Sequence, residues 1–431
     1  MTSAPPPMIQ AYCSLSSLAV PLTGALLSYR TKRGKEDKNR RSERYGRSET
    51  RRPEGPVIWV HAASVGETNA VMPLLNRILE DYPALSAVLT TTTVTSAKLV
   101  SGRLPPRTLH QFVPIDMRPH VRRFLTHWRP SIAIFAESEL WPNLLLEAQR
   151  AGTRLALVNG RMSARSHSRW KRAPRTISHL LSAFDLCLAQ SELDAARIVS
   201  LGARQVVNTG NLKFDAPALM ADDTEARTFT FRLARRPVWV AASTHAGEEE
   251  IAIDAHLEIA RRHPSLLTIL APRHPDRAED VASLLDARDI AYQRRSKTPL
   301  PNPGTNVFLV DTIGELGLVY RATDIVFMGG SLIPHGGQNP IEPARLTSAI
   351  LHGPHVGNFT EVYSALDRSG GAEEVRGSMA LAQAIERLID NPRKTAMRAD
   401  AARLALQPFS GALERSFAAL APMLDQAAAR P

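Results

Sequence analysis

The sequence contains little cysteine, which limits how the fold can be held together. Its 431 residues include two cysteines, Cys13 and Cys187, which lie far apart in the chain. Cys13 belongs to an apolar N-terminal stretch and Cys187 to a predicted strand, so we expect no disulfide framework. Proteins without such a framework are typical of a reducing compartment.

Metal ligands and aromatic residues are also sparse. The thirteen histidines are scattered, and the sequence contains neither a set of cysteine ligands nor a close cluster of His and carboxylate side chains. Protein metal sites are built from such clusters, so we expect no metal and no cofactor. Aromatic residues make up 6% of the chain and are not interleaved with basic ones, which argues against a nucleic-acid partner.

Positive charge, in contrast, is abundant and unevenly placed. The net charge is +11, and residues 30–52 alone carry eleven Lys or Arg against four Asp or Glu. They follow an uncharged run, residues 8–29, that is about as long as a membrane-spanning helix. An apolar run with a basic flank after it is typical of a membrane anchor, whereas in a signal peptide the basic residues come first. Because the run also contains four Ser and Pro21, it either spans the membrane or lies in its interface; a disordered basic tail is the alternative.

From Val57 onward, short apolar runs alternate with amphipathic segments of helical period. In the first half of the chain the predicted strands are residues 57–63, 86–93, 131–138, 154–160 and 185–190. The pattern restarts in the second half with residues 237–243, 266–272, 306–312, 324–330 and 349–354. Strands that alternate with helices form parallel sheets, so the sequence predicts an α/β fold of two Rossmann-like, doubly wound domains. Open sheets of this kind bind ligands beyond the carboxyl ends of their strands, and we expect an interdomain cleft between the two facing sheets.

This alternation divides the chain into five parts. They are an N-terminal membrane anchor over 1–29, a basic linker over 30–56, a first Rossmann-like domain over 57–215, a second over 216–410, and a C-terminal helix over 411–431. For the last helix, packing back on the first domain is one option. Because the strand pattern begins only at Val57, we expect neither domain core to need the N-terminal run.

Carboxylates gather where strands of the first domain end. Glu67 begins a helix directly after the first strand and a turn that contains Ser64 and Gly66. A carboxylate placed there can take a proton from an attacking hydroxyl, although it would also complement the helix dipole. Glu137 and Glu139 follow a later strand, at the same edge of the predicted sheet. Surface solvation explains one such glutamate more readily than three.

Lys213 stands at the predicted join between the domains, within the sequence TGNLKFD. Its ammonium group could reach the phosphate of a leaving group or pair with Glu137. A solvated surface lysine is the alternative.

The second domain supplies candidates for phosphate binding at its strand ends. Arg273 directly follows a strand and is suited to bidentate contact with a phosphate, and His274 offers a second donor. Residues 311–316 open another helix, whose free N–H groups face the same edge.

A glycine-rich stretch is the most informative part of the second domain. Residues 329–331 and 336–344 combine two glycine pairs, a helix-opening Pro340 and Glu342 on the first turn of that helix. Glycines let backbone N–H groups approach a phosphate closely, and a glutamate one turn into the helix can accept hydrogen bonds from ribose hydroxyls. A nucleotide sugar can be held in this way. A glycine-rich turn with an exposed glutamate is the alternative.

These motifs, taken in order, resemble those of a known family. The series runs HAASVGE, ESELWPN, NGRMSARS, TGNLKFD, AASTHAGEEE, APRHPDR, DTIGEL and GGSLIPHGGQNPIEPA. In order and spacing it resembles the 3-deoxy-D-manno-octulosonic acid (Kdo) transferases of Gram-negative lipid A assembly, over about residues 40 to 360. Departures are small: Gln338 stands where the family usually has His, and Gly160 where it often has Ala.

The resemblance implies a metal-independent, inverting glycosyltransferase of the GT-B fold. Its donor would be CMP-Kdo, and its acceptor would be lipid IVA, the precursor of lipid A. The resemblance also implies that the enzyme acts at the cytoplasmic face of the inner membrane, so membrane lipids are expected partners. Glu67 looks like the general base, and Glu137 and Lys213 look like groups that support the transition state. The CMP moiety would be held by Pro272, Arg273, Ile313, Gly314, Glu315, Asn339, Pro340, Ile341 and Glu342.

A phosphorylated acceptor would also give a role to a basic segment. Residues 161–175 contain six Lys or Arg, among them Arg161 and Arg165, and no acid. Together with Ser64 and Gly66, these arginines could contact the acceptor or its phosphates. A solvated basic helix is the alternative.

Three other functions fit parts of the sequence. Another GT-B enzyme, which uses a UDP-sugar donor and a lipid-linked acceptor, would keep the cleft and the carboxylates. A nucleotide-sugar epimerase of similar fold would need no acceptor lipid. A basic, membrane-tethered nucleic-acid binder would account for the charge but not for the few aromatic residues. The sequence indicates neither the number of Kdo units transferred nor an oligomeric state.

Overall fold

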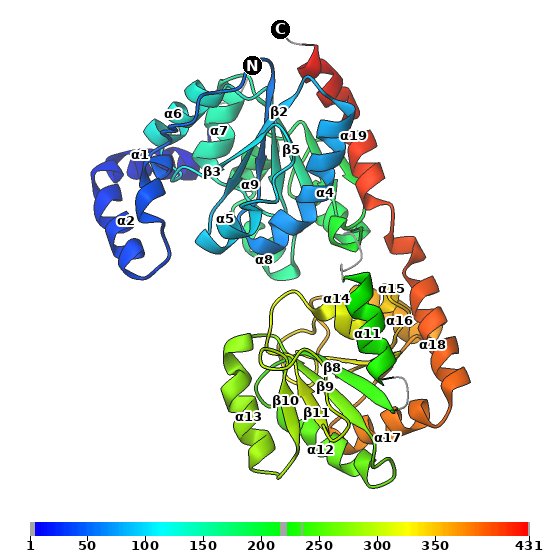
Figure 1. Ribbon diagram of the computed structural model, residues 1–431. Coiled ribbons are helices and arrows are strands. Elements are labelled where there is room, and N and C mark those ends of the chain that lie inside the picture. Colours follow the sequence, from blue (N-terminus) through cyan, green and yellow to red (C-terminus); the bar gives the residue numbers. More distant parts are fainter. Residues whose placement is uncertain (1–4, 216–221, 234–235, 430–431) are drawn as a thin grey trace. The chain divides into compact units, whose positions relative to one another are not determined.

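The chain forms two compact units, each built around its own parallel sheet (Figure 1). The computed structural model describes residues 5–215, 222–233 and 236–429, apart from the side chain of Asp223. The first unit comprises Met1–Ala216 and Phe409–Pro431, and the second comprises Pro217–Pro408. The two seven-stranded sheets with helices on them confirm the predicted fold of two doubly wound α/β domains.

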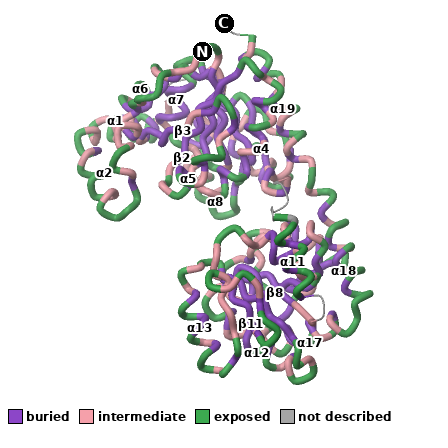
Figure 2. The backbone as a smooth tube through the Cα atoms, in the orientation of Figure 1, coloured by how far each residue is buried: buried purple, intermediate pink, exposed green. Residues whose placement is uncertain are grey.

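The strands of the first unit pair in parallel in the order β3-β2-β1-β4-β5-β6-β7. They are β1 (Val57–His61), β2 (Ser86–Thr91), β3 (Thr108–Phe112), β4 (Ile132–Ala136), β5 (Arg154–Gly160), β6 (Leu186–Ala189) and β7 (Val206–Asn208). In β1, Trp59 belongs to the core cluster on one face of the sheet and Ile58 to the cluster on the other. Burial on both faces is why such a strand reads as a continuous apolar run, and Figure 2 shows buried residues concentrated in the sheets.

The first unit also contains helices on both faces of this sheet and, near its N-terminus, helices that pack on other helices and turns. They are α1 (Pro7–Leu18), α2 (Thr23–Lys32), α3 (Arg41–Arg44), α4 (Val65–Asp81), α5 (Val94–Val100), α6 (Arg118–Trp128), α7 (Pro142–Arg150), α8 (Ala164–Trp170), α9 (Pro174–Leu181), α10 (Glu192–Ser200) and α19 (Ala412–Ala428). Short 3₁₀ turns add η1 (Val20–Leu22), η2 (Lys38–Arg40) and η3 (Leu212–Phe214).

The second unit repeats the plan with the strand order β10-β11-β9-β8-β12-β13-β14. Its strands are β8 (Val238–Thr244), β9 (Leu267–Pro272), β10 (Tyr292–Arg294), β11 (Val307–Leu309), β12 (Ile325–Met328), β13 (Ala349–His352) and β14 (Ala372–Glu374). Its helices are α11 (Asp223–Leu233), α12 (Glu248–Ala260), α13 (Ala278–Asp286), α14 (Leu316–Tyr320), α15 (Ile341–Arg345), α16 (Thr360–Ser369), α17 (Ser378–Ile389) and α18 (Pro392–Ala405), with 3₁₀ turns η4 (Pro275–Arg277) and η5 (Gln407–Phe409).

The uncharged N-terminal run folds onto the first unit as α1 and α2. Ile9 and Cys13 of α1 are buried in the same core cluster as Phe124 of α6 and Leu144 of α7. The Tyr12 hydroxyl also donates to the carboxylate of Asp116 at 2.9 Å. The expectation that neither core needs this run was therefore wrong for the first unit, because the run supplies side chains that cover α6 and α7.

The outer side of these helices remains apolar and exposed. Its side chains, which we call the apolar N-terminal face, are Met8, Tyr12, Leu15, Leu18, Leu22, Leu26 and Tyr29. By length and composition, no single helix within the described residues could cross a membrane. Taken together, Pro7–Leu18 and Val20–Lys32 are long and apolar enough to do so, but a bend of 51° lies between them.

The C-terminal helix α19 packs against α4 of the first unit (Figure 1). Leu420 and Leu424 share a buried cluster with Leu74 and Ile78 of α4. The carboxylate of Asp215 accepts the backbone N–H groups of residues 411 and 413, at 2.8 and 2.6 Å, and so satisfies free donors at the start of α19. The chain thus returns to its first unit after completing the second.

Candidate active site

Polar groups gather where the strand order of each sheet reverses. In the first sheet this switch point lies between β1 and β4, which are followed by Glu67 and Glu137. In the second it lies between β8 and β12, which are followed by His245 and the glycine-rich residues 329–331. In open α/β sheets the loops diverge at a switch point and leave a crevice at the carboxyl ends of the strands. These are the expected positions of ligand-binding groups.

Glu67 lies on the first turn of α4, where it caps the helix together with Ser64. The Ser64 hydroxyl donates to Oε1 of Glu67 at 2.9 Å, and the backbone N–H of Ala63 donates to Oε2 at 2.7 Å. Burial raises the pKa of the Glu67 carboxyl; these hydrogen bonds oppose the rise, and the charges of Glu137 and Glu139 add to it. A carboxylate with a raised pKa accepts a proton more readily than an ordinary exposed one.

Glu137 forms an ion pair with Lys213. The Nζ atom of Lys213 lies 2.5 Å from Oε1 of Glu137, which confirms the pairing that the sequence left open. Glu137 has a φ of 57°, in the left-handed region that non-glycine residues rarely adopt. Its backbone N–H still donates to the carbonyl of Val158 on β5 at 2.9 Å. Backbone strain of this kind concentrates at functional sites, so it supports a role for this carboxylate.

Glu139 lies beside His61 at the same edge. The Nε2 atom of His61 lies 3.6 Å from Oε2 of Glu139, and the Trp141 indole N–H donates to that carboxylate. Burial alone would raise the pKa of Glu139, but His61 and Trp141 hold it below its usual range. The Nδ1 atom of His61 lies 2.9 Å from the Thr90 hydroxyl. Sequence reasoning gave His61 no role, because its partners come from two other strand ends.

Gly66 and Arg161, two further predicted contacts of the first unit, are linked to this cluster through their backbone. Gly66 lies on the first turn of α4 beside Glu67. Arg161 follows β5, and its carbonyl accepts the Ser138 hydroxyl at 2.5 Å. The side chains of Arg161 and Arg165 are exposed, so they are free to meet a phosphate or simply solvent.

In the second unit the structure brings Arg273, Asn339 and Glu342 into one neighbourhood. Burial raises the pKa of the Glu342 carboxyl, while a hydrogen bond with the Asn339 side chain and the charge of Arg273 act in the opposite direction. Pro272 is the last residue of β9, and Pro340 and Ile341 are the N-cap and first residue of α15. The cluster thus combines a cation, an amide and a half-buried carboxylate, groups that can contact a phosphate and a ribose.

The predicted contacts at 313–315 lie in the turn before α14. The carboxylate of Glu315 forms a bidentate ion pair with Arg295, with both N–O distances at 2.8 Å, and Thr312 also donates to it. Burial would raise the pKa of Glu315, but these bonds hold it below its usual range. Ile313 is 88% exposed and Gly314 has a φ of 91°. The Glu315 carboxylate is therefore already engaged within the protein. The groups that this turn can present to a ligand are those of its backbone.

The loop that begins at the first glycine pair binds a carboxylate of the protein itself. Glu248, fully buried at the start of α12, accepts the backbone N–H groups of Gly330 at 2.6 Å, Ser331 at 3.0 Å and Leu332 at 2.9 Å. The expectation that the N–H groups of residues 330 and 331 approach a phosphate was wrong, because the Glu248 carboxylate already occupies them. Nothing in the sequence distinguishes Glu248 from the two glutamates after it.

Three histidines lie together beside this loop. The ring of His245 stacks on His335 with 4.0 Å between centroids, and His274 lies edge-on at 5.9 Å. Gln338, the departure from the family pattern, places its Nε2 atom 3.0 Å from Nε2 of His245. Burial, followed by the charges of His335, His274 and Arg273, lowers the pKa of His245 to about 4. His245 is therefore neutral at pH 7 and would gain a proton more readily beside an anion.

Metal ligands are not part of this arrangement. Across residues 5–215, 222–233 and 236–429, no group of three or more His, Cys, Asp or Glu side chains is placed to hold a metal ion. Positive charge near the histidines comes from Arg273 and from Arg277, which pairs with Glu249 at 2.6 Å.

Two doubly wound units with polar groups at each switch point define a protein of the GT-B fold class. Among solved structures, the chain is similar to the UDP-GlcNAc 2-epimerase of Neisseria meningitidis, determined with UDP-GlcNAc, with a TM-score of 0.59 and 15% identity over 86% of this chain and 100% of that one. It is also similar to a glycosyltransferase of Rickettsia africae, with a TM-score of 0.58 and 11% identity over 88% and 100% of the two chains. At these identities the likeness concerns the fold alone.

Sequence comparison is more specific. The family model described as 3-deoxy-D-manno-octulosonic-acid transferase (kdotransferase) matches residues 39–216. The 3-deoxy-D-manno-octulosonic acid transferase of Haemophilus influenzae is 35% identical over 425 residues, which cover 96% of this chain and 98% of the relative. That of Bordetella pertussis is 35% identical over 391 residues, or 88% and 90% of the two chains. The chain therefore belongs to the Kdo transferase family of glycosyltransferases, as its motifs predicted.

Proposed function

We propose that this chain transfers Kdo from CMP-Kdo to lipid IVA, the lipid A precursor, with inversion at the anomeric carbon. Membership of the Kdo transferase family supports Kdo as the transferred sugar. The observation that carries the proposal is the buried carboxylate of Glu67, with its raised pKa, near the ion pair of Glu137 and Lys213. A single displacement with inversion needs one carboxylate as base, and Glu67 fits that requirement.

The proposed reaction is a single displacement. An acceptor hydroxyl gives its proton to Glu67 while its oxygen forms the bond to the anomeric carbon of Kdo. The bond from that carbon to the phosphate oxygen of CMP breaks, and the phosphate keeps the bonding electrons. A positioned base contributes typically about 10²–10⁴ in rate. Lys213, oriented by Glu137, would stabilise part of the charge that shifts during transfer.

The second unit is the proposed donor site. Arg273 would contact the phosphate through its planar guanidinium group. Glu342, oriented by Asn339, would accept hydrogen bonds from the ribose hydroxyls, and the backbone of residues 313–315 remains a predicted contact. His245 is neutral in the free protein, so it can take up a proton as negative charge appears on the leaving phosphate. These basic side chains are the reason to propose a reaction without a metal.

We further propose that the first unit binds the cytoplasmic face of the inner membrane, where a lipid acceptor would lie. The apolar N-terminal face supports this, because seven large apolar side chains are exposed along α1, η1 and α2. Basic residues at the end of α2, including Arg30 and Lys32, would lie beside anionic headgroups. Since Ile9 and Cys13 are buried against the first unit, the structure favours helices that lie in the interface.

Mass spectrometry of the lipid product tests the proposed function. Purified protein, CMP-Kdo and lipid IVA should yield lipid IVA that is heavier by one or more Kdo residues, and NMR of the product should show an anomeric configuration opposite to that of the donor. Unmodified lipid IVA would refute the acceptor, and retained configuration would refute the single displacement.

A UDP-sugar donor is the second candidate, because another GT-B enzyme with such a donor would keep the same carboxylates at the strand ends. Protection against thermal unfolding separates the two donors, since a nucleotide that binds the folded state raises the melting temperature. CMP should protect at lower concentrations than UDP. Equal or stronger protection by UDP would favour the alternative.

A further inference from the structure

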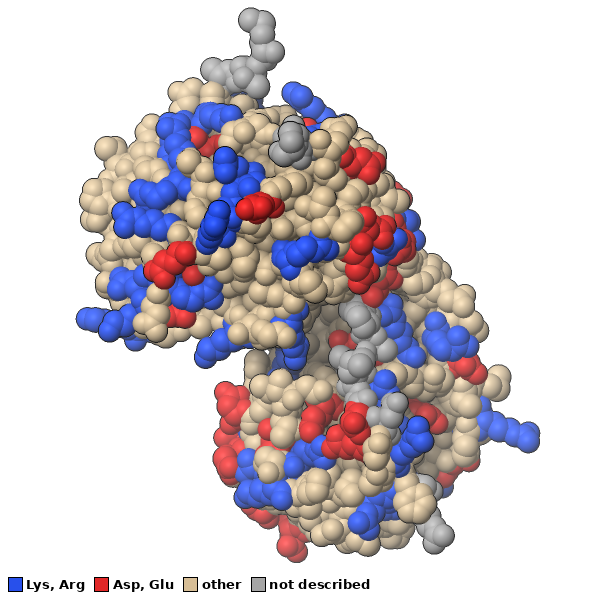
Figure 3. All heavy atoms as spheres, turned by 45° about the horizontal axis from the view of Figure 1, so that its top comes forward, with Lys and Arg blue, Asp and Glu red and all other residues tan. Residues whose placement is uncertain are grey.

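A pocket of about 870 Å³ opens at the amino-terminal edge of the first sheet, opposite the edge that carries Glu67 and Glu137. It is lined by the segments that precede β1, β4 and β5 and by the last turns of α6 and α7. This edge is at the top in Figure 1, because Arg154, the first residue of β5, hydrogen-bonds Gln426 near the end of α19. Figure 3, which brings the top forward, shows Lys and Arg side chains gathered on this face of the first unit.

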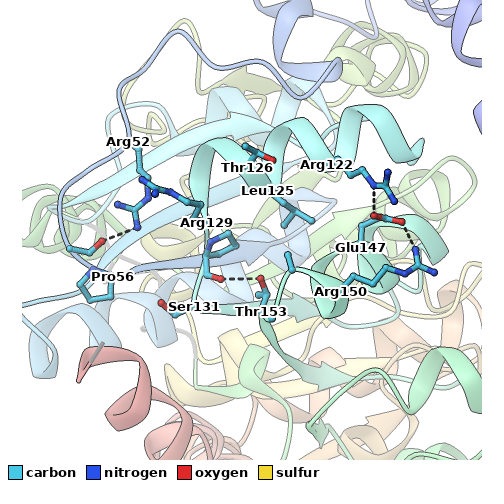
Figure 4. A pocket seen from close by; sticks show the side chains of 14 residues that line it. Arg52, Pro56, Arg122, Leu125, Thr126, Arg129, Ser131, Glu147, Arg150 and Thr153 are labelled. Atoms are coloured by element: carbon cyan, nitrogen blue, oxygen red, sulfur yellow. Dashed lines mark hydrogen bonds and ion pairs between the residues drawn. The ribbon is translucent and has the colours of Figure 1, made fainter. Parts of the chain in front are cut away.

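The residues that line the pocket include four arginines, Arg52, Arg122, Arg129 and Arg150, and one carboxylate, that of Glu147 (Figure 4). At one end, the buried Glu147 pairs with Arg122 at 2.7 Å, with Arg150, and with Arg118 at 3.1 Å, which does not line the pocket. Burial would raise the pKa of Glu147, but Arg122 and Arg150 hold it below its usual range. Glu147 therefore stays ionised and offsets one positive charge.

At the other end, Arg52 and Arg129 lie beside each other without a carboxylate. Arg52 donates to the carbonyl oxygens of Trp128 at 2.8 Å, Pro53 at 2.7 Å and Gly55 at 2.9 Å, and these neutral partners do not offset its charge. Burial, followed by the charge of Arg129, lowers the pKa of Arg52. In the described parts of the chain, no Asp or Glu forms an ion pair with either arginine.

Helix dipoles explain part of this arrangement. Both α6 and α7 end at this edge, and basic side chains favour the negative ends of helices. Arg52 fulfils that role when it binds the carbonyl of Trp128, the last residue of α6. Arg129 does not, because its side chain is exposed toward the pocket and has no such partner within the described residues. Arg129 also has a φ of 44°, a position that glycine would occupy at lower cost.

We propose that this pocket binds a phosphate-bearing anion, held between Arg129 and Arg52 with Arg122 and Arg150 at its far end. A guanidinium group matches two oxygens of a phosphate, so a pair of unneutralised arginines favours a doubly charged phosphoryl group. The volume leaves room for an organic group beyond the phosphate. The phosphoryl group belongs either to a soluble compound or to a membrane lipid. This site is separate from the proposed transfer reaction, because it lies at the opposite edge of the sheet.

Binding of inorganic pyrophosphate by the full chain tests the soluble source. Calorimetry in saturating CMP, which fills the proposed donor site, should detect binding that Arg129→Gln weakens by at least about tenfold and that Arg129→Glu abolishes, since each removes a charged phosphate partner. Arg103→Gln is the matched control, because Arg103 is exposed on the same unit and does not line the pocket. It should change the affinity by less than about twofold, as expected for a distant surface charge.

Vesicle co-sedimentation tests the lipid source. Phosphatidylcholine vesicles with and without phosphatidic acid should be compared for the same four proteins. If a lipid is the ligand, phosphatidic acid should increase binding of the wild type and of Arg103→Gln more than that of the Arg129 variants. If the Arg129 variants bind one of the two probes less well than Arg103→Gln does, the proposed site is supported. The probe that shows this difference identifies the source of the phosphoryl group. If neither probe separates the Arg129 variants from Arg103→Gln, the proposal is overturned.

Discussion

The ammonium group of Lys213 and the carboxylate of Glu137 form an ion pair at 2.5 Å, and the two side chains are 33% and 16% exposed. The pair links the end of β4 to the turn η3, which lie far apart in the sequence. Glu137 also raises the pKa of Glu67, although burial of Glu67 is the larger cause. The three side chains are therefore coupled, and a change in one alters the charge that the others experience.

Because of this coupling, losses from substitutions at Glu137 and Lys213 should not multiply. We expect Glu137→Gln and Lys213→Met each to lower kcat/KM for Kdo transfer by at least about tenfold, since each leaves a partner without its counter-charge. The double variant should lose less than the product of the single losses. Steady-state kinetics of the four proteins measure this, with thermal unfolding as a control for stability. Fully multiplicative losses would show that the two groups act independently.

Glu67→Gln should remove the base while keeping the helix cap. The glutamine oxygen can still accept one hydrogen bond at the start of α4, so we expect CMP protection and folding close to wild type. Turnover should fall by at least about a hundredfold, within the range for loss of a general base. Near-normal turnover would exclude Glu67 as the base.

Ser64→Ala is the companion variant, because it removes a hydrogen bond that lowers the pKa of Glu67. A base must be ionised, so activity falls as the pH drops through its pKa. We expect the acid limb of the kcat/KM profile to move to higher pH in Ser64→Ala, with stability reduced by about 1 kcal/mol through loss of the N-cap. An unmoved acid limb would assign that limb to another group.

The proposed donor site can be tested without the acceptor. Arg273→Ala and Glu342→Ala should both weaken the protection that CMP gives against thermal unfolding, because one removes a phosphate partner and the other a ribose acceptor. Arg393→Ala, at an exposed position of α18, is a control for the loss of one positive charge. CMP protection that survives in both variants would place the nucleotide elsewhere.

Binding of CMP should be linked to protonation of His245. The pKa of His245 is lowered to about 4 in the folded protein, against about 6.5 in an unfolded chain, so this histidine reduces stability as the pH falls from about 6.5 to about 4. A phosphate beside the ring would raise that pKa, and binding near pH 5.5 should take up protons. Calorimetry in two buffers of different ionisation enthalpy measures the uptake.

His245→Gln should reduce this uptake, whereas His127→Gln, on the first unit, should leave it unchanged. Comparison of the two variants removes the contribution of the CMP phosphate itself. The same uptake in wild type and in His245→Gln would show that the phosphate does not lie beside this ring.

The central strands were predictable because burial on both faces leaves uninterrupted apolar runs, as in β1 and β4. The strands β3, β10 and β14 were not predicted. β10 and β14 contain three residues each and lie at sheet edges, too short for a pattern. β3 has the sequence TLHQF, in which polar residues interrupt the apolar ones. Local sequence also gave the positions of Glu67 and Glu137, because groups that follow parallel strands meet at one edge.

Pairings between distant segments could not be predicted in the same way. Glu248 resembles its neighbours Glu249 and Glu250 in the sequence, yet its carboxylate binds the backbone of a loop that follows it by about eighty residues. Arg52 and Arg129 are likewise two basic residues among many, until the first sheet places the segments before its strands side by side. Such contacts depend on the tertiary fold, which residue patterns do not encode locally.

The N-terminal helices allow a test that separates folding from membrane binding. Ile9 and Leu15 lie on the same helix, but Ile9 is 1% exposed within the core of the first unit and Leu15 is 66% exposed. Ile9→Ala should therefore lower the free energy of unfolding by about 2–5 kcal/mol through lost burial and a cavity. Leu15→Ala should change it by less than about 0.5 kcal/mol, as is usual at exposed positions. Denaturant titration of the two variants measures both effects.

Substitutions at the exposed positions should instead reduce membrane association. Replacing Leu15, Leu18 and Leu22 by Ser removes much of the apolar N-terminal face without touching a buried side chain, so the triple variant should remain folded but float less with vesicles. Deletion of residues 1–29 would remove Ile9 and Cys13 as well, and should destabilise the first unit in addition to reducing flotation. If the triple variant floats as well as wild type, this face is not the membrane contact. If the deletion leaves stability unchanged, the contacts of α1 with the core do not stabilise the first unit.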